Sequence, residues 1–155
     1  FLQLESFNNI NYTGIDIINE MVIKAKNNFP SIAFYCCDFI ETKITKYTYI
    51  VSSGSLNIKI DSNELVHFKY VKNFIKKMFT NSTHACSFNL LSKEGQAFFD
   101  QQNDLFYYAD ISSIENFCKT LTKYYIIDYS PLDYVFTISL FKKPQLINKI
   151  SKEIN

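Results

Sequence analysis

The chain has 155 residues, 47% of them hydrophobic and 20% charged, which suits one domain (residues 1–155) with an ordinary core. A net charge of +1 and the absence of arginine argue against a nucleic-acid reader and against electrostatic attachment to a membrane. Four cysteines without metal-ligand spacing (Cys36, Cys37, Cys86 and Cys118) predict reduced, mostly buried thiols of a cytoplasmic protein with no metal site.

The first third of the chain alternates between strand-like and helix-like apolar spacing. Ile18, Met21, Val22 and Ala25 fall on one face of a helix that Asp16 or Asn19 could cap. The elements predicted here, in chain order, are the last turns of a helix (1–7), a strand (12–17), a helix ending before Pro30, a strand (31–39) and a strand (47–57).

The remaining chain continues this alternation and closes with two strands. Two pairs, Asp61 with Glu64 and Ser112 with Glu115, resemble capping boxes at helix starts. The elements predicted here are a helix (62–79), a strand (84–92), a long connection (93–109), a helix ending near 123, and two strands (124–130 and 134–142) joined by a tight turn. We therefore expect an α/β fold, a Rossmann-like three-layer sandwich whose mostly parallel sheet ends in an antiparallel hairpin.

Polar side chains follow several of the predicted strands. Asp16, Asp38, residues 52–57 and Asn89 all stand at strand carboxyl ends, the edge at which open α/β sheets bind ligands. Ionised carboxylates accept charge-assisted hydrogen bonds from a ribose diol and from an exocyclic amine. The two acids therefore predict an adenosine-like ligand. The alternative is that Asp16 only caps a helix and Asp38 is a solvated turn residue.

Several segments together resemble a class I S-adenosylmethionine-dependent methyltransferase. They are YTGIDI, MVIKAKNNFP, FYCCDF, YIVSSGSLN and the closing pair YYIIDYS and YVFTISLF, and the resemblance runs from residue 1 to about 143. It implies S-adenosylmethionine as cofactor, with Asp16 on the ribose hydroxyls and Asp38 on adenine N6. Ile17 and Phe39 would flank the adenine ring.

The resemblance also implies residues on the methionine and acceptor side of the site. Ser53 and Gly54, which follow the third predicted strand, would line the methionine part of the cofactor. The residues expected on the substrate side are Asn57, Asn89, Tyr107 and Tyr108. No catalytic residue is predicted, because methyl transfer needs positioning more than an obligatory triad.

One part of the family pattern has no counterpart here. The resemblance implies the strand order 3-2-1-4-5-7-6, in which the first strand and its GxGxG loop lie centrally, between the strands that end at Asp16 and Ser52. The chain opens at Phe1 inside what would be the first helix, so we expect a longer natural protein. The alternative is a catalytically inactive remnant of the fold that acts as a binding module.

The absence of two motifs narrows the class of molecule that could accept the methyl group. An Asp/Asn-Pro-Pro-Tyr motif and a Pro-Cys pair, typical of nucleic-acid methylation, are missing, which leaves a small-molecule or protein acceptor. The alternative enzyme class is a nicotinamide-dependent reductase. The short-chain type of reductase needs a tyrosine four residues before a lysine, and no tyrosine in this sequence has a lysine at that position. We expect the aromatic residues of the 93–109 connection to pack on the fold rather than to form a lid; these are Phe98, Phe99, Phe106, Tyr107 and Tyr108.

The two histidines are not predicted to do chemistry. His67 lies among polar neighbours on the 62–79 helix and is expected on the solvated surface. His84 precedes a predicted strand and could act as a general base, but isolated histidines usually have no chemical role.

Overall fold

A computed structural model describes residues 10–98, 104–129 and 134–144, and the chain divides into two compact units. Unit 1 is Phe1–Lys43 and unit 2 is Ile44–Asn155. The predicted helix end at 1–7 and the predicted turn between the last two strands lie outside the described residues. The expected single domain stays a prediction.

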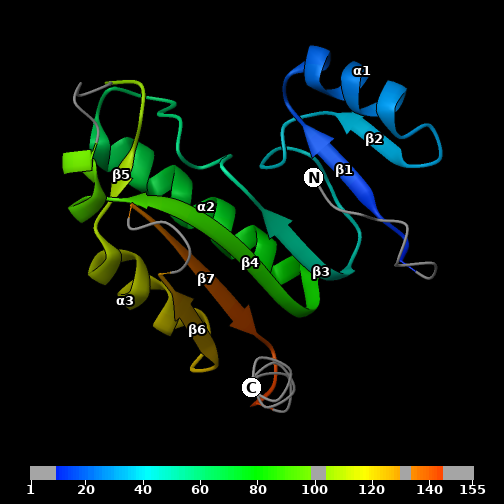
Figure 1. Cartoon of the computed structure of the whole chain (residues 1–155). Coiled ribbons are helices and arrows are strands. Elements are labelled where there is room, and N and C mark those ends of the chain that lie inside the picture. The colour runs from blue at the N-terminus through cyan, green and yellow to red at the C-terminus, as the bar shows by residue number, and fades with distance from the viewer. Residues whose placement is uncertain (1–9, 99–103, 130–133, 145–155) are drawn as a thin grey trace. The chain divides into compact units, whose positions relative to one another are not determined.

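Unit 1 is a strand–helix–strand unit with parallel strands (Figure 1). Its elements are β1 (Thr13–Asp16), α1 (Asn19–Asn28) and β2 (Ala33–Cys36). Val22 of α1 is buried, and Gly14 of β1 lies under the ring of Phe34, where a Cβ atom would come within 2.3 Å of the ring. Glycine is therefore required at position 14 for this packing.

Unit 2 is built around one larger sheet (Figure 1). Its elements are β3 (Tyr47–Ser52), α2 (Glu64–Asn81), β4 (Ser82–Ser92), the 3₁₀ helix η2 (Glu94–Phe98), β5 (Tyr108–Ala109), α3 (Ile111–Leu121), β6 (Tyr125–Asp128) and β7 (Val135–Phe141). The strand order is β3-β4-β7-β6, with β5 parallel to the end of β4. β3 runs parallel to β4, whereas β7 is antiparallel to both β4 and β6.

The predicted α/β class and the closing antiparallel hairpin are confirmed. If strand 1 is left out of the expected order 3-2-1-4-5-7-6, the neighbours 3-2 and 4-5-7-6 remain. The two observed sheets, β1-β2 and β3-β4-β7-β6, have these same neighbours. β5 was not predicted, because a two-residue strand has too few positions to show alternation.

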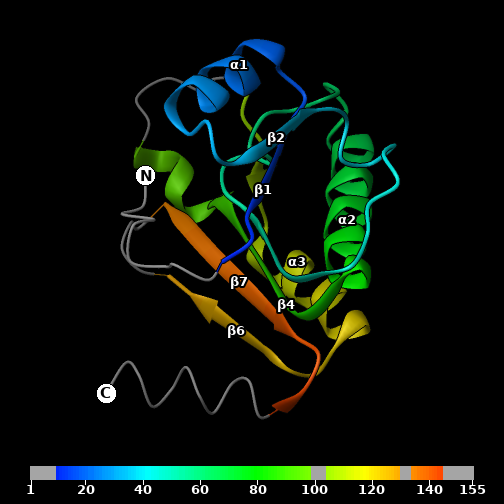
Figure 2. The same ribbon diagram turned by 90° about the vertical axis from the view of Figure 1, so that its right-hand side faces the viewer.

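The core of unit 2 lies between its sheet and its helices. α2 contacts β3, β4 and α3, and Figure 2 shows it beside β4. It buries an apolar stripe at helical spacing that includes Val71, Ile75 and Met78, each 0% exposed. On the sheet side, Phe88 and Leu90 of β4 are buried. Burying each such side chain contributes about 1.5–3 kcal/mol relative to exposure, so this stripe is the main stabilising contact of α2.

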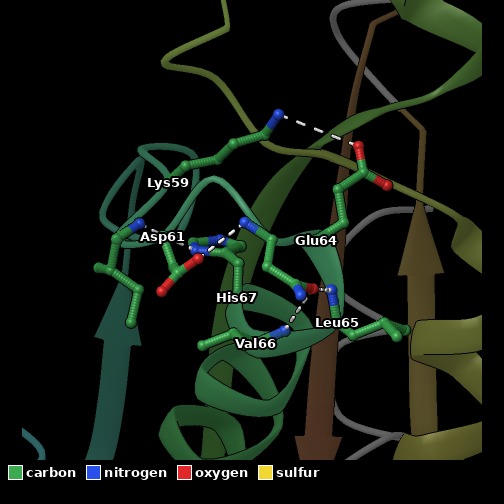
Figure 3. Close-up of polar contacts among 8 residues, drawn as sticks. Lys59, Asp61, Glu64, Leu65, Val66 and His67 are labelled. Atoms are coloured by element: carbon green, nitrogen blue, oxygen red, sulfur yellow. Dashed lines mark hydrogen bonds and ion pairs between the residues drawn. The ribbon is translucent and has the colours of Figure 1, made fainter.

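The two predicted capping boxes are wrong. α2 is capped by Asn63, whose Oδ1 accepts from the backbone N–H groups of Leu65 at 2.9 Å and Val66 at 3.4 Å (Figure 3). Asp61 instead accepts from the Asn63 N–H. α3 is capped by Asp110, two residues before the predicted Ser112. Asp, Asn and Ser are all good caps, so a run of them does not identify the true one.

The expectation of buried thiols holds for two of the four cysteines. All four are free; Cys86 and Cys118 are buried, Cys37 is half-buried and Cys36 is exposed. The expectation is wrong for Cys36 because three of the four residues of β2 are exposed. In the described part of the chain, no helix is long and apolar enough to cross a membrane.

Candidate functional site

The two predicted carboxylates follow neighbouring strands at one end of the unit 1 sheet. Asp16 is the last residue of β1 and lies opposite Cys36, the last residue of β2. The Cys37 N–H donates to the Asp16 carbonyl oxygen at 3.0 Å, which continues the strand pairing up to Asp38. Both aspartates are half-buried. The parallel register therefore brings both acids to the same edge.

Each of these aspartates shapes its own turn. Asp16 Oδ1 accepts from the Ile18 N–H at 2.9 Å, and Asp38 Oδ1 accepts from the Ile40 N–H at 2.6 Å. The N-cap of α1 is Ile18, without a side-chain cap, so the expected capping by Asp16 or Asn19 is wrong. Each of these turns uses only the Oδ1 atom of its aspartate.

The residues next to the acids differ in exposure. Ile17 is 66% exposed, although it directly follows a strand, and Phe39 is half-buried. An exposed large apolar side chain beside a carboxylate suits a ligand with a flat apolar face and polar edges.

In unit 2, the loop 53–60 after β3 is tied to the end of β4. Gly54 has a φ of +77° and donates its N–H to Asn89 Oδ1 at 2.7 Å. The Asn89 Nδ2 donates to Ser53 Oγ at 3.4 Å. Three predicted site residues from two neighbouring strand ends thus meet, and the positive φ at Gly54 explains the glycine in the Ser-Gly-Ser turn.

Asn57 joins the loop 53–60 to two further segments. Its Oδ1 accepts from the Leu91 N–H at 3.0 Å, and its carbonyl oxygen accepts from the Tyr107 N–H at 2.8 Å. Ile58 forms an antiparallel bridge with Phe106. The predicted substrate-side residues of unit 2 therefore lie along one network of hydrogen bonds.

The aromatic residues of the 93–109 connection pack inward where the structure describes them. Tyr107 is 5% exposed, Tyr108 is also buried, and Phe106 is half-buried. Burial raises the pKa of Tyr107 to about 12, with Glu64 and Asp110 adding to the shift, so its phenol stays protonated. This favours the core-packing alternative over an open lid. Phe99 and the side chain of Phe98 lie outside what the structure describes.

Ser52 provides a buried polar atom at the end of β3. The residue is 9% exposed, and its Oγ has no hydrogen-bond partner among the described residues. A buried hydroxyl without a partner is costly, and such groups usually have a water or ligand partner. Across residues 10–98, 104–129 and 134–144, no group of three or more His, Cys, Asp or Glu side chains could hold a metal ion.

The expectation of a surface His67 is wrong, because this residue is 0% exposed. Its ring packs against the Tyr107 ring with centroids 4.4 Å apart, and both ring nitrogens meet backbone groups of the loop 53–60. His67 also precedes Val71, Phe74 and Ile75 on the buried face of α2. That i, i+4, i+7, i+8 spacing was the available sequence signal for its burial.

His84 has no part in either group of predicted site residues. It is exposed near the amino end of β4, where its Nδ1 lies 3.1 Å from Thr83 Oγ1 and its ring packs against Tyr49. Asn89 and Leu91, which contact the loop 53–60, lie further along the strand toward its carboxyl end.

Three solved structures show what this fold is similar to. Magnesium protoporphyrin IX methyltransferase from Synechocystis, with bound SAH, is 12% identical with a TM-score of 0.58, covering 84% of this chain and 63% of that chain. An S-adenosylmethionine-dependent methyltransferase from Clostridium acetobutylicum is 15% identical with a TM-score of 0.62, covering 85% and 75%. Human N-acetylserotonin methyltransferase, in complex with SAM, is 13% identical with a TM-score of 0.64, covering 90% and 42%.

The chain therefore has the fold of class I S-adenosylmethionine-dependent methyltransferases, as the sequence resemblance predicts. It spans about three fifths of the length of the Synechocystis enzyme. Neither a protein-family model nor a curated protein sequence matches it.

Proposed function

We propose that the protein, at the full length its gene encodes, binds S-adenosylmethionine and transfers its methyl group to a small-molecule or protein acceptor. The observation that carries this proposal is the pair of half-buried carboxylates, Asp16 and Asp38, at one edge of the β1-β2 sheet in a chain with this fold. Solved structures with the fold contain SAM or SAH.

The chemistry of the unit 1 residues fits the adenosine part of this cofactor. The Asp16 carboxylate would accept from the ribose hydroxyls, and the Asp38 carboxylate would accept from the adenine amine. Ile17, exposed beside Asp16, would cover one face of the adenine ring. Each aspartate is held by its own turn, so little side-chain entropy is lost on binding.

Within unit 2, the residues expected on the methionine and acceptor side form a group of their own around the loop 53–60. Gly54 leaves open space where a Cβ atom would stand, and the Ser52 hydroxyl has no partner among the described residues. Ser53 would lie on the methionine side. The acceptor side of the site would be lined by Asn57, Asn89, Tyr107 and Tyr108.

Methyl transfer from a sulfonium is an in-line displacement, and the cofactor supplies the electrophilic methyl group. The protein contributes by fixing the acceptor atom in line with that methyl and by excluding water. We assign no general base. We further propose a cytoplasmic protein, because its cysteines are free thiols. We propose that it has neither a nucleic acid nor a membrane as a partner, because its net charge is near zero and arginine is absent.

A thermal-shift comparison on the full-length protein tests this proposal. S-adenosylmethionine and its demethylated product should each raise the unfolding temperature in a concentration-dependent way, whereas NADPH should not, because added stability follows occupancy. A shift with NADPH alone would favour a reductase. Cofactor binding without methyl transfer to any acceptor would favour the inactive binding module.

A further inference from the structure

His67 connects α2 to the loop 53–60 through both of its ring nitrogens. Its Nδ1 accepts from the Ile60 N–H at 3.2 Å, and its Nε2 lies 3.3 Å from the Leu56 carbonyl oxygen. The two backbone partners are four residues apart in the same loop. A single buried side chain therefore fixes the spacing of two loop positions and their distance from α2.

The partners determine which ring nitrogen carries the proton. A carbonyl oxygen only accepts, so Nε2 must carry a hydrogen to bond Leu56. A backbone N–H only donates, so Nδ1 must be bare to bond Ile60. The geometry thus requires the neutral imidazole with the proton on Nε2. A second proton on Nδ1 would point at the Ile60 N–H and break that hydrogen bond.

The charges around the ring also disfavour a second proton. Lys59 from the loop acts on His67 as a like charge, and its ammonium is 3.9 Å from the exposed carboxylate of Glu64. The other titratable neighbours are Tyr70 on α2 and Tyr107, whose rings pack against the imidazole. Burial is the largest cause that lowers the pKa of His67, whereas the hydrogen bond to Leu56 raises it less.

The loop that His67 holds carries residues of the proposed site. Gly54 and Asn57 are tied to β4 by side-chain bonds, but the far end of the loop, at Ile60, is tied to α2 through His67. Lys59 and Asn57 add backbone bonds to the 105–107 segment. Losing the Ile60 bond would therefore release the end of the loop nearest α2 first.

We propose that His67 is a positioning residue whose neutral ring holds the Ile60 end of the loop 53–60 against α2, and that protonation of His67 releases this end of the loop. The functional meaning rests on the proposed function, because the loop carries Ser53, Gly54 and Asn57. The release itself is a property of the protein without any ligand.

Amide hydrogen exchange followed by NMR on the ligand-free protein tests this inference. Below the ordinary histidine value of pH 6.5, the protection factor of the Ile60 amide should fall about tenfold per pH unit, because one proton is taken up per opening. The fall should level off once the folded protein itself binds that proton. The His67 ring signals should titrate below the ordinary histidine value of 6.5.

Two variants provide the controls. His67→Gln keeps a donor and an acceptor but cannot be charged, so protection at Ile60 should become independent of pH. His84→Gln removes the other histidine of this sequence and should leave the pH dependence of Ile60 unchanged. If His67→Gln does not fold, the coincidence of the His67 ring titration with the loss of protection at Ile60 in the unaltered protein decides the matter.

The inference is overturned if the Ile60 amide keeps its protection while the His67 ring becomes protonated, or if His67→Gln shows the same pH dependence as the unaltered protein. Titrating S-adenosylmethionine into the same samples separates the two proposals. A pH-dependent loop in a protein that never binds this cofactor would refute the proposed function and leave the positioning role of His67 standing.

Discussion

Desolvation makes the two buried thiols, Cys86 and Cys118, less reactive than the exposed thiol of Cys36. Burial raises the pKa of Cys86 and of Cys118 to about 12, because a thiolate is poorly solvated in an apolar core. At pH 8 roughly one molecule in ten thousand would carry either thiolate, and the thiolate is the reactive form. Exposed Cys36 should therefore be alkylated by iodoacetamide far faster than Cys86 or Cys118. Peptide mass spectrometry over a time course measures the rate of modification at each cysteine. Equal rates at Cys36, Cys86 and Cys118 would contradict this prediction.

Among the described residues, Gly54 alone has a positive φ, and this backbone conformation restricts substitution. Its φ of +77° is unfavourable for a residue with a Cβ atom, although nothing lies within 4 Å of where that atom would stand. Gly54→Ala should lower the free energy of unfolding by about 1–2 kcal/mol through backbone strain. Gly54→Asn should cost less, since asparagine tolerates this region better. Equal losses in urea denaturation for both variants would show that strain is not the cause.

At the scale of elements, helix capping gives a direct test of the observed starts. Asn63→Ala removes the acceptor for the Leu65 and Val66 amides and should destabilise the protein by about 1 kcal/mol. Ser112→Ala, at a position that the sequence pattern predicts as a cap, should change the stability by less than about 0.5 kcal/mol. Chemical denaturation of both variants checks this. A larger loss for Ser112→Ala would contradict the assignment of Asp110 as the cap of α3.

Most elements could be predicted because their apolar spacing is regular over several turns or alternations. α2 is the clearest case, because its buried residues Val71, Ile75 and Met78 recur at helical spacing. His67 was missed although its spacing with Val71 and Ile75 placed it on the buried face of α2. His67 is buried by Leu56, Ile60 and Tyr107, which come from two separate loops, and its own polar character suggested a surface position.

Some of the site residues could likewise be placed from the sequence, and others could not. Asp16 and Asp38 could be placed at one edge because parallel register follows from the strand–helix–strand pattern. The hydrogen bonds of Asn57 to Leu91 and Tyr107 could not be predicted, because they require the exact path of two irregular segments. The inward packing of Tyr107 likewise follows from that path.

For the whole molecule, the lowered pKa of His67 predicts how the free energy of unfolding depends on pH. Its pKa is lowered in the folded protein, so the unfolded chain binds a proton at a higher pH than the folded one does. This stabilising contribution is complete above the unfolded value of 6.5 and is lost as the pH falls from there through the lowered folded value. Urea midpoints should therefore fall between pH 7.5 and pH 5, and His67→Gln should flatten that fall. An equally steep fall in the variant would assign the effect to other groups.

We propose that the two acids of unit 1, Asp16 and Asp38, hold the adenosine part of S-adenosylmethionine. Calorimetric titration of this cofactor into the full-length protein, its Asp16→Ala variant and its Glu20→Gln variant tests it most directly. Asp16→Ala should weaken binding by about 1.5–3 kcal/mol, since charge-assisted bonds to the ribose are lost. Glu20→Gln, a change at an exposed position on α1, should leave the affinity unchanged. An unaltered affinity in Asp16→Ala, or no binding by the unaltered protein, would contradict the claim.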